Sequence, residues 1–311
     1  MTTVSYLIID KLSTAYQCDR ESAEGITQLI FGYMNSKELP LKYLGSWYRN
    51  YGYLHNWRLT LPDCGNAAYV LLQTLPSKHN AAGFRMEWNP NNLGVDGNRF
   101  LWATLEYFLL DDYQFFIDSA VVTRIDFAVD VTPMTLESIW VKGDSLRFSR
   151  PMIGDKGEMQ SIYLGTRRSA KSFCIYNRNP ETLDRISSDP FNMRIEARRK
   201  PKCTIHELQG ISNPFERLTV IKAVDPIELS NAPDKYALFL DSVKLRGLQG
   251  ALARIRRYET RGRYSTWVEE HLLPVDWFDP ETIWNGYSNA YESLALPYLL
   301  EPNTHLEQEE G

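Results

Sequence analysis

The chain has 311 residues, of which 43% are hydrophobic and 23% are charged, and its formal net charge is −5. This is an ordinary globular composition, and it excludes a disordered or collagen-like chain. No window approaches the roughly 18 consecutive apolar residues of a membrane span, and the first residues lack the pattern of a signal peptide. The four cysteines show no Cys-x-x-Cys spacing, which argues against a zinc site or disulfide framework and favours a reducing cytoplasm.

Apolar periodicity predicts the elements of the first part of the chain. A helix is expected over residues 19–35, with Ser22 as its cap. Short aromatic and β-branched runs after this helix predict strands over 43–50, 51–61, 67–75 and 84–90. The sequence Asn-Pro-Asn-Asn then favours a turn, and a second helix is expected over 98–110.

Four further strands are expected in the middle of the chain, over 121–131, 159–165, 171–178 and 191–199. The first of them stops at Thr132-Pro133 and leads into a short helix over 136–141. Beyond a soft boundary near residue 210, helices are predicted over 214–224 and 234–258. The expected fold class is α+β, with an antiparallel β-sheet core backed by helices and a more helical C-terminal region, 211–311.

The negative total conceals an uneven distribution of charge. Residues 161–202 hold ten basic side chains against four acidic ones. A second basic segment, 244–263, holds seven Lys or Arg and one acid, Glu259. Affinity for DNA phosphates comes largely from Lys and Arg, so these two segments carry the only charge pattern that favours DNA.

Each central strand is expected to carry one polar face, because side chains alternate between the faces of a strand. The three polar faces consist of Arg124, Asp126 and Asp130, of Cys174, Tyr176 and Arg178, and of Arg194, Glu196 and Arg198. Aligned in one sheet, they bring carboxylates, arginines and a tyrosine together, a set that suits metal-assisted phosphodiester chemistry. The simpler interpretation is a solvated face with cross-strand ion pairs, and spacing alone does not name a reaction.

Three segments on these strands follow one another as RIDFAVD (124–130), SIYLGTRRSAKSFCIYNR (161–178) and RIEARRK (194–200). In this order they resemble the R-x-D-x-x-x-D strand, the Y-L-G-S-R-x-S … Y-D-K block and the R-x-E-x-R strand of the replication initiation factor (Rep_trans) family. That family includes rolling-circle initiators of plasmids and filamentous phages and related conjugative relaxases. A further segment, 84–93, is similar to one in phage-type members, so the resemblance covers residues 84–200.

The resemblance implies a rolling-circle replication initiator. Such an enzyme nicks and rejoins one DNA strand at the origin through a 5′-phosphotyrosine intermediate and depends on Mg²⁺ or Mn²⁺. It implies Tyr176 as the nucleophile, with Tyr163 as the rival, and Asp126, Glu196 and Asp130 as metal ligands. Residues 1–210 are then the catalytic nicking-joining domain.

One position departs from the family pattern, which has lysine two residues after the tyrosine where this chain has Arg178. Arginine keeps the charge that clamps a phosphate but does not readily give up a proton. The His-x-His metal site of other initiators is absent, since the five histidines include no such pair.

The basic side chains expected to contact DNA are Arg124, Arg167, Arg168, Lys171, Arg194, Arg198, Arg199, Arg261 and Arg263. The last two are expected in a glycine-containing loop. The implied partners are the replication origin, with a single-stranded or cruciform nick site, and a host helicase, and a homodimer is left open. Two alternative functions stay open: an origin-binding protein that does not nick, and a conjugative relaxase of the same family.

Overall fold

The structure is a computed structural model that describes residues 2–37, 39–45, 52–61, 68–77, 82–143, 149–155, 159–166, 168–178, 192–223 and 234–297. The chain falls into two compact units. Unit one consists of Met1–Leu7, Phe127–Arg199 and Ser212–Gly286. Unit two consists of Ile8–Asp126, Lys200–Ile211 and Tyr287–Gly311. Residues beyond 210 contribute to both units, and the division into a catalytic domain and a helical region stays a prediction.

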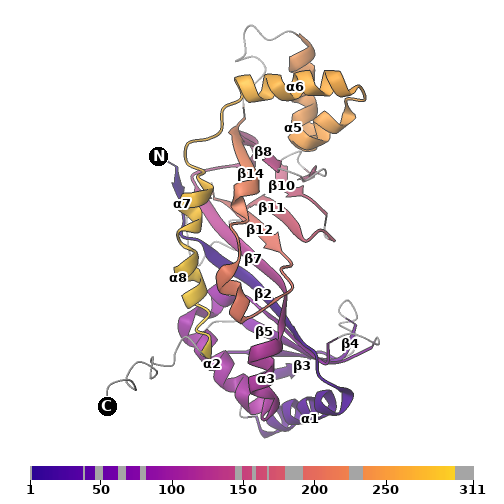
Figure 1. The fold of residues 1–311 in the computed structure, drawn as a ribbon, viewed down its shortest axis with the longest axis vertical. Helices are drawn as coiled ribbons and strands as arrows, with labels where there is room; N and C mark the ends of the chain where they lie inside the picture. The colour runs from indigo at the N-terminus through magenta and orange to yellow at the C-terminus, as the bar shows by residue number, and fades with distance from the viewer. Residues whose placement is uncertain are drawn as a thin grey trace, which may run out of the picture. The chain divides into compact units, whose positions relative to one another are not determined.

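Unit two is built on strands in the order β3-β4-β5-β6-β2-β7. Their bounds are β2 (Ile8–Tyr16), β3 (Leu41–Tyr43), β4 (Tyr53–Thr60), β5 (Tyr69–Pro76), β6 (Phe84–Trp88) and β7 (Val121–Thr132), and β13 (Cys203–Thr204) pairs with the start of β7. Trp57, Leu72 and Met86 lie opposite one another on β4, β5 and β6 and are fully buried. The covering helices are α1 (Arg20–Ser36), α2 (Pro90–Leu109), α3 (Asp112–Ser119) and α8 (Tyr287–Glu292), with the short turn η3 (His206–Gly210) (Figure 1).

Unit one continues from the second half of β7 in the order β7-β12-β11-β10-β9, with β1 along the end of β7. The bounds are β1 (Thr3–Val4), β9 (Ser149–Ile153), β10 (Met159–Leu164), β11 (Lys171–Asn177) and β12 (Met193–Arg199). The four sheet strands expected in the middle of the chain are confirmed as β7, β10, β11 and β12. Together with the helices, these antiparallel strands confirm the α+β fold class.

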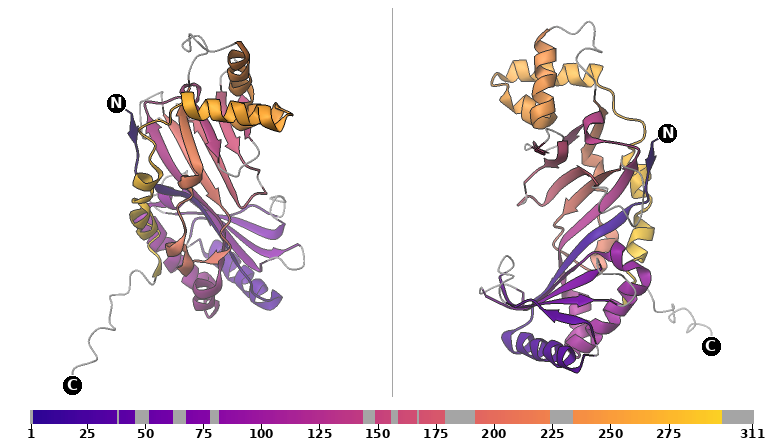
Figure 2. Two further views of the ribbon diagram at one scale, coloured as in Figure 1. Left: turned by 45° about the horizontal axis from the view of Figure 1, so that its top comes forward. Right: turned by 180° about the vertical axis from the view of Figure 1, so that it is seen from behind.

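A second, smaller core in unit one joins a two-stranded sheet to helices. The sheet pairs β8 (Ile139–Gly143) with β14 (Leu218–Lys222). Trp140 and Ile221 from these strands pack with Leu240 of α5 (Asp234–Arg254) and Trp267 of α6 (Tyr258–His271), two helices that cross one another (Figure 2). The remaining short elements are η2 (Leu136–Ser138), η4 (Phe215–Arg217) and α7 (Pro280–Trp284). Within the described part of the chain, no helix has the length and apolar character to cross a bilayer.

Two helix starts differ from the sequence prediction. Asp19, rather than Ser22, caps α1, since its carboxylate accepts a hydrogen bond from the Ser22 amide at 2.8 Å. The expected turn Asn-Pro-Asn-Asn is the beginning of α2: Asn89 is the cap and Pro90 occupies the first turn. Proline is well suited to this position, because the amide it lacks has no partner at a helix start.

The helix predicted over 214–224 is wrong, because Leu218–Lys222 forms strand β14. Three consecutive β-branched residues, Thr219, Val220 and Ile221, favour a strand that packs against β8. The short helix predicted over 136–141 is reduced to η2, and β8 begins at Ile139. The loop expected around Arg261 and Arg263 is part of helix α6.

Candidate functional site

The polar faces of β10, β11 and β12 are aligned within unit one. Tyr176 on β11 lies opposite Arg194 on β12, and Cys174 lies opposite Glu196. On the other side of β11, Tyr163 of β10 lies opposite Cys174. The antiparallel register therefore places both candidate tyrosines and Glu196 on one face, as the alternation of the sequence predicts.

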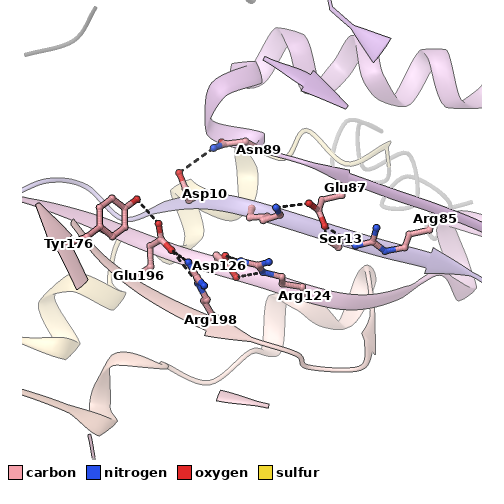
Figure 3. A network of polar contacts seen from close by, with 11 residues as sticks. Asp10, Ser13, Arg85, Glu87, Asn89, Arg124, Asp126, Tyr176, Glu196 and Arg198 are labelled. Atoms are coloured by element: carbon pink, nitrogen blue, oxygen red, sulfur yellow. Dashed lines mark hydrogen bonds and ion pairs between the residues drawn. The ribbon is translucent and has the colours of Figure 1, made fainter. Parts of the chain in front are cut away.

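Tyr176 and Glu196 are joined by a short hydrogen bond on this face. The Tyr176 hydroxyl donates to Glu196 Oε1 at 2.6 Å, and Arg198 Nη2 donates to Glu196 Oε2 at 2.8 Å (Figure 3). Glu196 is only 4% exposed, whereas Tyr176 is half-buried. A buried carboxylate that accepts from a tyrosine and is held by a guanidinium is positioned to receive the proton of that tyrosine.

Asp130 forms a second ion-pair cluster in unit one. Arg194 donates hydrogen bonds to the Asp130 carboxylate from Nε at 2.7 Å and from Nη2 at 2.8 Å. Arg178 Nη1 donates a third hydrogen bond to it at 2.8 Å. Both arginines were expected to contact phosphate. In this arrangement Asp130 neutralises part of their charge, and the cluster fixes the ends of β7, β11 and β12 to one another.

Asp126 and Arg124 form an ion pair in unit two. Both lie on β7, two residues apart on the same face, and Arg124 binds Asp126 through Nε at 2.9 Å and Nη2 at 2.5 Å (Figure 3). Asp126 is 2% exposed. Because Asp126 and Glu196 belong to different units, the cation expected to bridge them stays a prediction.

The environment of Tyr163 is less favourable for a nucleophile. The neighbouring Cys174 and burial raise the pKa of the Tyr163 hydroxyl, and the hydrogen bond with Ser161 and the nearby Arg198 only partly oppose them. A raised pKa makes the phenolate scarcer at neutral pH, where an unperturbed tyrosine is already almost fully protonated. Of the two candidate tyrosines, Tyr176 therefore has the better-placed proton acceptor.

Basic side chains gather at the start of β11 and the end of β12. Lys171 lies opposite Arg199, and burial together with the positive charges of Arg199 and Arg217 lowers the pKa of Lys171. Arg217, which the sequence analysis missed, comes from η4, and only the fold brings it to this cluster. Arg168 is exposed in the preceding turn, whereas Arg167 lies outside the described residues.

Arg261 binds a backbone carbonyl, and its predicted contact with DNA stays a prediction. Its Nε and Nη2 both donate to the carbonyl oxygen of Ile255, at 3.1 and 2.7 Å, and so secure the turn between α5 and α6. Arg263, two residues along the same helix, is exposed. The exposed basic residues around this turn are Arg254, Arg256, Arg257 and Arg263.

Arg261→Ala is expected to lower the thermal unfolding midpoint by several degrees, because the Ile255 carbonyl loses two hydrogen bonds from a charged donor, worth about 1.5–3 kcal/mol. Arg263→Ala should leave the midpoint unchanged and weaken DNA binding instead. Differential scanning fluorimetry and a DNA-binding titration on both variants check this. Equal effects of the two substitutions on DNA affinity, without a change in midpoint, would reject the structural role of Arg261.

The carboxylates predicted as metal ligands are each engaged by arginine, and their binding of a cation stays a prediction. Each predicted ligand is bound by arginine: Asp126 by Arg124, Glu196 by Arg198, and Asp130 by Arg178 and Arg194. Among the described residues no group of three or more His, Cys, Asp or Glu side chains is gathered in a way that could hold an ion. The positive charge beside these carboxylates comes from arginine.

Comparisons with known proteins add one structural likeness. No protein-family profile and no curated protein sequence matches the chain. A solved structure described as a rolling circle replication initiator protein from Geobacillus stearothermophilus is similar, with 16% sequence identity and a TM-score of 0.40. The alignment covers 79% of this chain and 98% of that protein.

Proposed function

We propose that this protein is a rolling-circle replication initiator that nicks and rejoins one strand of origin DNA. The observation that carries the proposal is the 2.6 Å hydrogen bond from the Tyr176 hydroxyl to Glu196, on a sheet face lined with arginines. The order of the motifs around Tyr176 and Glu196, which resembles the Rep_trans family, supports the same function. We expect the nicking reaction to take place in the cytoplasm and a host helicase to unwind the nicked duplex.

The proposed reaction transfers a phosphoryl group of the DNA from the 3′ oxygen to the hydroxyl oxygen of Tyr176. Tyr176 Oη attacks the phosphorus while its proton passes to Glu196, and the bond from phosphorus to the 3′ oxygen breaks. The protein is then joined to the 5′ phosphate, and the 3′ oxygen leaves as a hydroxyl after taking up the proton. Attack by a free 3′-OH on the phosphotyrosine reverses these steps and rejoins the strand, so the bond energy is conserved.

Arginine supplies the electrostatic part of the proposed mechanism. Arg198 is 29% exposed in its side chain and adjoins Glu196, so its guanidinium can bind a phosphate oxygen while Glu196 accepts the proton. Positive charge at this position stabilises the extra negative charge that the phosphate gains in the transition state. Lys171 and Arg199 alternate with the residues of this face and therefore lie on the other side of the sheet, so they take no part in the proposed phosphate contacts of this face.

The test is formation of a covalent complex. The full chain is incubated with single-stranded DNA from its own replicon, with Mg²⁺ or Mn²⁺, and the product is separated under denaturing conditions. A protein–DNA adduct that survives denaturation supports the proposal, and a parallel reaction in EDTA measures whether the cation predicted from the sequence is required. If DNA binds but forms no adduct under any of these conditions, the chain is an origin-binding protein that does not nick.

Glu196→Gln should slow adduct formation at neutral pH by about 10²-fold or more, because the amide does not accept the Tyr176 proton. The rate of this variant should rise with pH toward about 10, where tyrosine ionises without help. Single-turnover rates between pH 6 and 10 measure both effects. Glu270→Gln, on the exposed side of α6, is the control, and a pH profile of Glu196→Gln that parallels the wild type would rule out proton transfer to Glu196.

A further inference from the structure

Unit two contains a cavity of about 390 Å³ that lies apart from Tyr176 and Glu196 in the sequence and belongs to a different unit. Its walls come from β2, β4, β5, β6 and the start of α2. The volume falls within the range of small-ligand sites, which are about 300–1,000 Å³. None of the catalytic groups proposed above lines it.

One wall of the cavity is a stacked pair of side chains. The guanidinium carbon of Arg58 lies 4.4 Å from the centroid of the Tyr69 ring. Tyr69 is 42% exposed, although it stands on an inner strand of the sheet between β4 and β6. Leu71, two residues along β5 and opposite Arg58 in the register, forms an apolar floor beside this pair.

The opposite wall is polar but carries little net charge. Lys11 Nζ lies 2.5 Å from Glu87 Oε1, and Arg85 and Ser13 donate to Glu87 Oε2 (Figure 3). Burial alone would raise the pKa of Glu87, but the hydrogen bonds and charges of Lys11 and Arg85 outweigh it and lower the pKa. Glu87 is therefore ionised and balanced within the wall.

Hydrogen-bonding groups line the mouth of the cavity at the start of α2. The Asn89 amide donates to Asp10 Oδ1 at 3.2 Å, and Asn92 lies one helical turn further on. Figure 3 shows Asp10 and Asn89 turned toward one another across the gap between β2 and α2. Amide and carboxylate groups in such a position match the donors and acceptors on the edge of a nucleobase.

We infer that this cavity binds one unpaired base of single-stranded DNA, an inference that rests on the proposed function for the identity of the polymer. A base has a flat apolar face for the Arg58–Tyr69 pair and a polar edge for the amides. A phosphate group alone is a poorer match. In the lining, the negative charges of Asp10 and Glu87 offset the positive charges of Lys11 and Arg58. A paired base does not enter the cavity, because its hydrogen-bonding edge is occupied by the complementary base and its faces are stacked in the duplex.

The test compares DNA with and without bases. Binding of a labelled thymidine oligonucleotide of about 12 residues and of an abasic oligonucleotide of equal length is measured by fluorescence anisotropy. The protein is the full chain carrying Tyr176→Phe, so that no strand is cut. We expect the thymidine oligonucleotide to bind about 10-fold more tightly than the abasic one, and Tyr69→Ala to remove this difference without changing abasic binding.

Two further variants test whether Tyr69→Ala acts through loss of the aromatic ring or through a disturbed fold. Tyr69→Phe keeps the ring and should retain most of the difference, and Tyr107→Ala removes a 60% exposed tyrosine on α2, outside the cavity. A base-dependent difference that persists in Tyr69→Ala overturns the inference, as does its loss in Tyr107→Ala.

The outcomes for the cavity and for the proposed function are separable. If wild-type protein forms a Tyr176-dependent adduct while Tyr69→Ala leaves the base-dependent difference in affinity unchanged, base binding in the cavity is rejected and the proposed nicking function is retained. If no adduct forms but Tyr69→Ala removes that difference in affinity, the nicking function is rejected and base binding in the cavity is retained.

Discussion

Tyr176→Phe should lower covalent adduct formation by at least about 10³-fold, the loss expected when a nucleophile is removed. The substitution removes the hydroxyl that attacks the phosphorus and the hydrogen bond to Glu196, and it leaves the ring in place. The half-buried position of Tyr176 means that the loss of one hydrogen bond should not unfold the sheet. Adduct yield at a fixed time, with DNA binding measured in parallel, gives the result.

Tyr163→Phe is the matched control for this prediction. Tyr163 lies on the neighbouring strand of the same face, but among the described residues its hydroxyl has no hydrogen bond to a carboxylate like the one from Tyr176 to Glu196. We expect this variant to form the adduct at close to the wild-type rate. An adduct that survives Tyr176→Phe and disappears in Tyr163→Phe would transfer the nucleophilic role to Tyr163.

Asp130→Ala should destabilise the protein by about 3–5 kcal/mol, the cost of leaving buried charge without its partner. The side chain of Arg194 is only 8% exposed and that of Arg178 is 19% exposed. Removing Asp130 takes away the carboxylate that both guanidinium groups share and leaves the two positive charges close together. Urea unfolding followed by circular dichroism measures the change in the free energy of unfolding.

The control for this prediction is an ion pair at the surface. Asp96→Ala breaks the contact between Asp96 and Arg99 on α2, whose side chains are 96% and 52% exposed. Water screens that pair, so its loss should not shift the unfolding midpoint measurably. If Asp130→Ala and Asp96→Ala have the same small effect, the cluster around Asp130 does not hold the strands together.

The strands of the site were accessible from the sequence because their alternation is strong. In β7 and β12 an arginine and an acid stand two residues apart, which predicts that they share one face. The structure then shows the pairs Arg124–Asp126 and Arg198–Glu196 on those faces. The convergence of Arg178 and Arg194 on Asp130 was not accessible, because these partners are 48 and 64 residues apart along the chain. Such contacts depend on the register between strands, which no single segment contains.

The sequence was a weaker guide where tertiary packing decides the local structure. Strand β2 escaped prediction because Leu12 on one face and Ser13 on the other are both buried, so no clean alternation marks it. The segment around Arg261 looks like a loop because of Gly262, yet it is helical, and Trp267 from the same helix packs into the second core. The roles of Arg217 and Tyr69 likewise follow only from the fold.

Mapping the modified peptide tests the central claim most directly. Trypsin cuts after Lys171 and Arg178, which releases residues 172–178 with Tyr176, and a separate peptide, 157–167, carries Tyr163. After nuclease digestion of the adduct, mass spectrometry should find a 5′-linked nucleotide on Tyr176 in the first peptide. A nucleotide on Tyr163, or on any residue outside 172–178, would contradict the assignment of Tyr176 and Glu196 as the reacting pair.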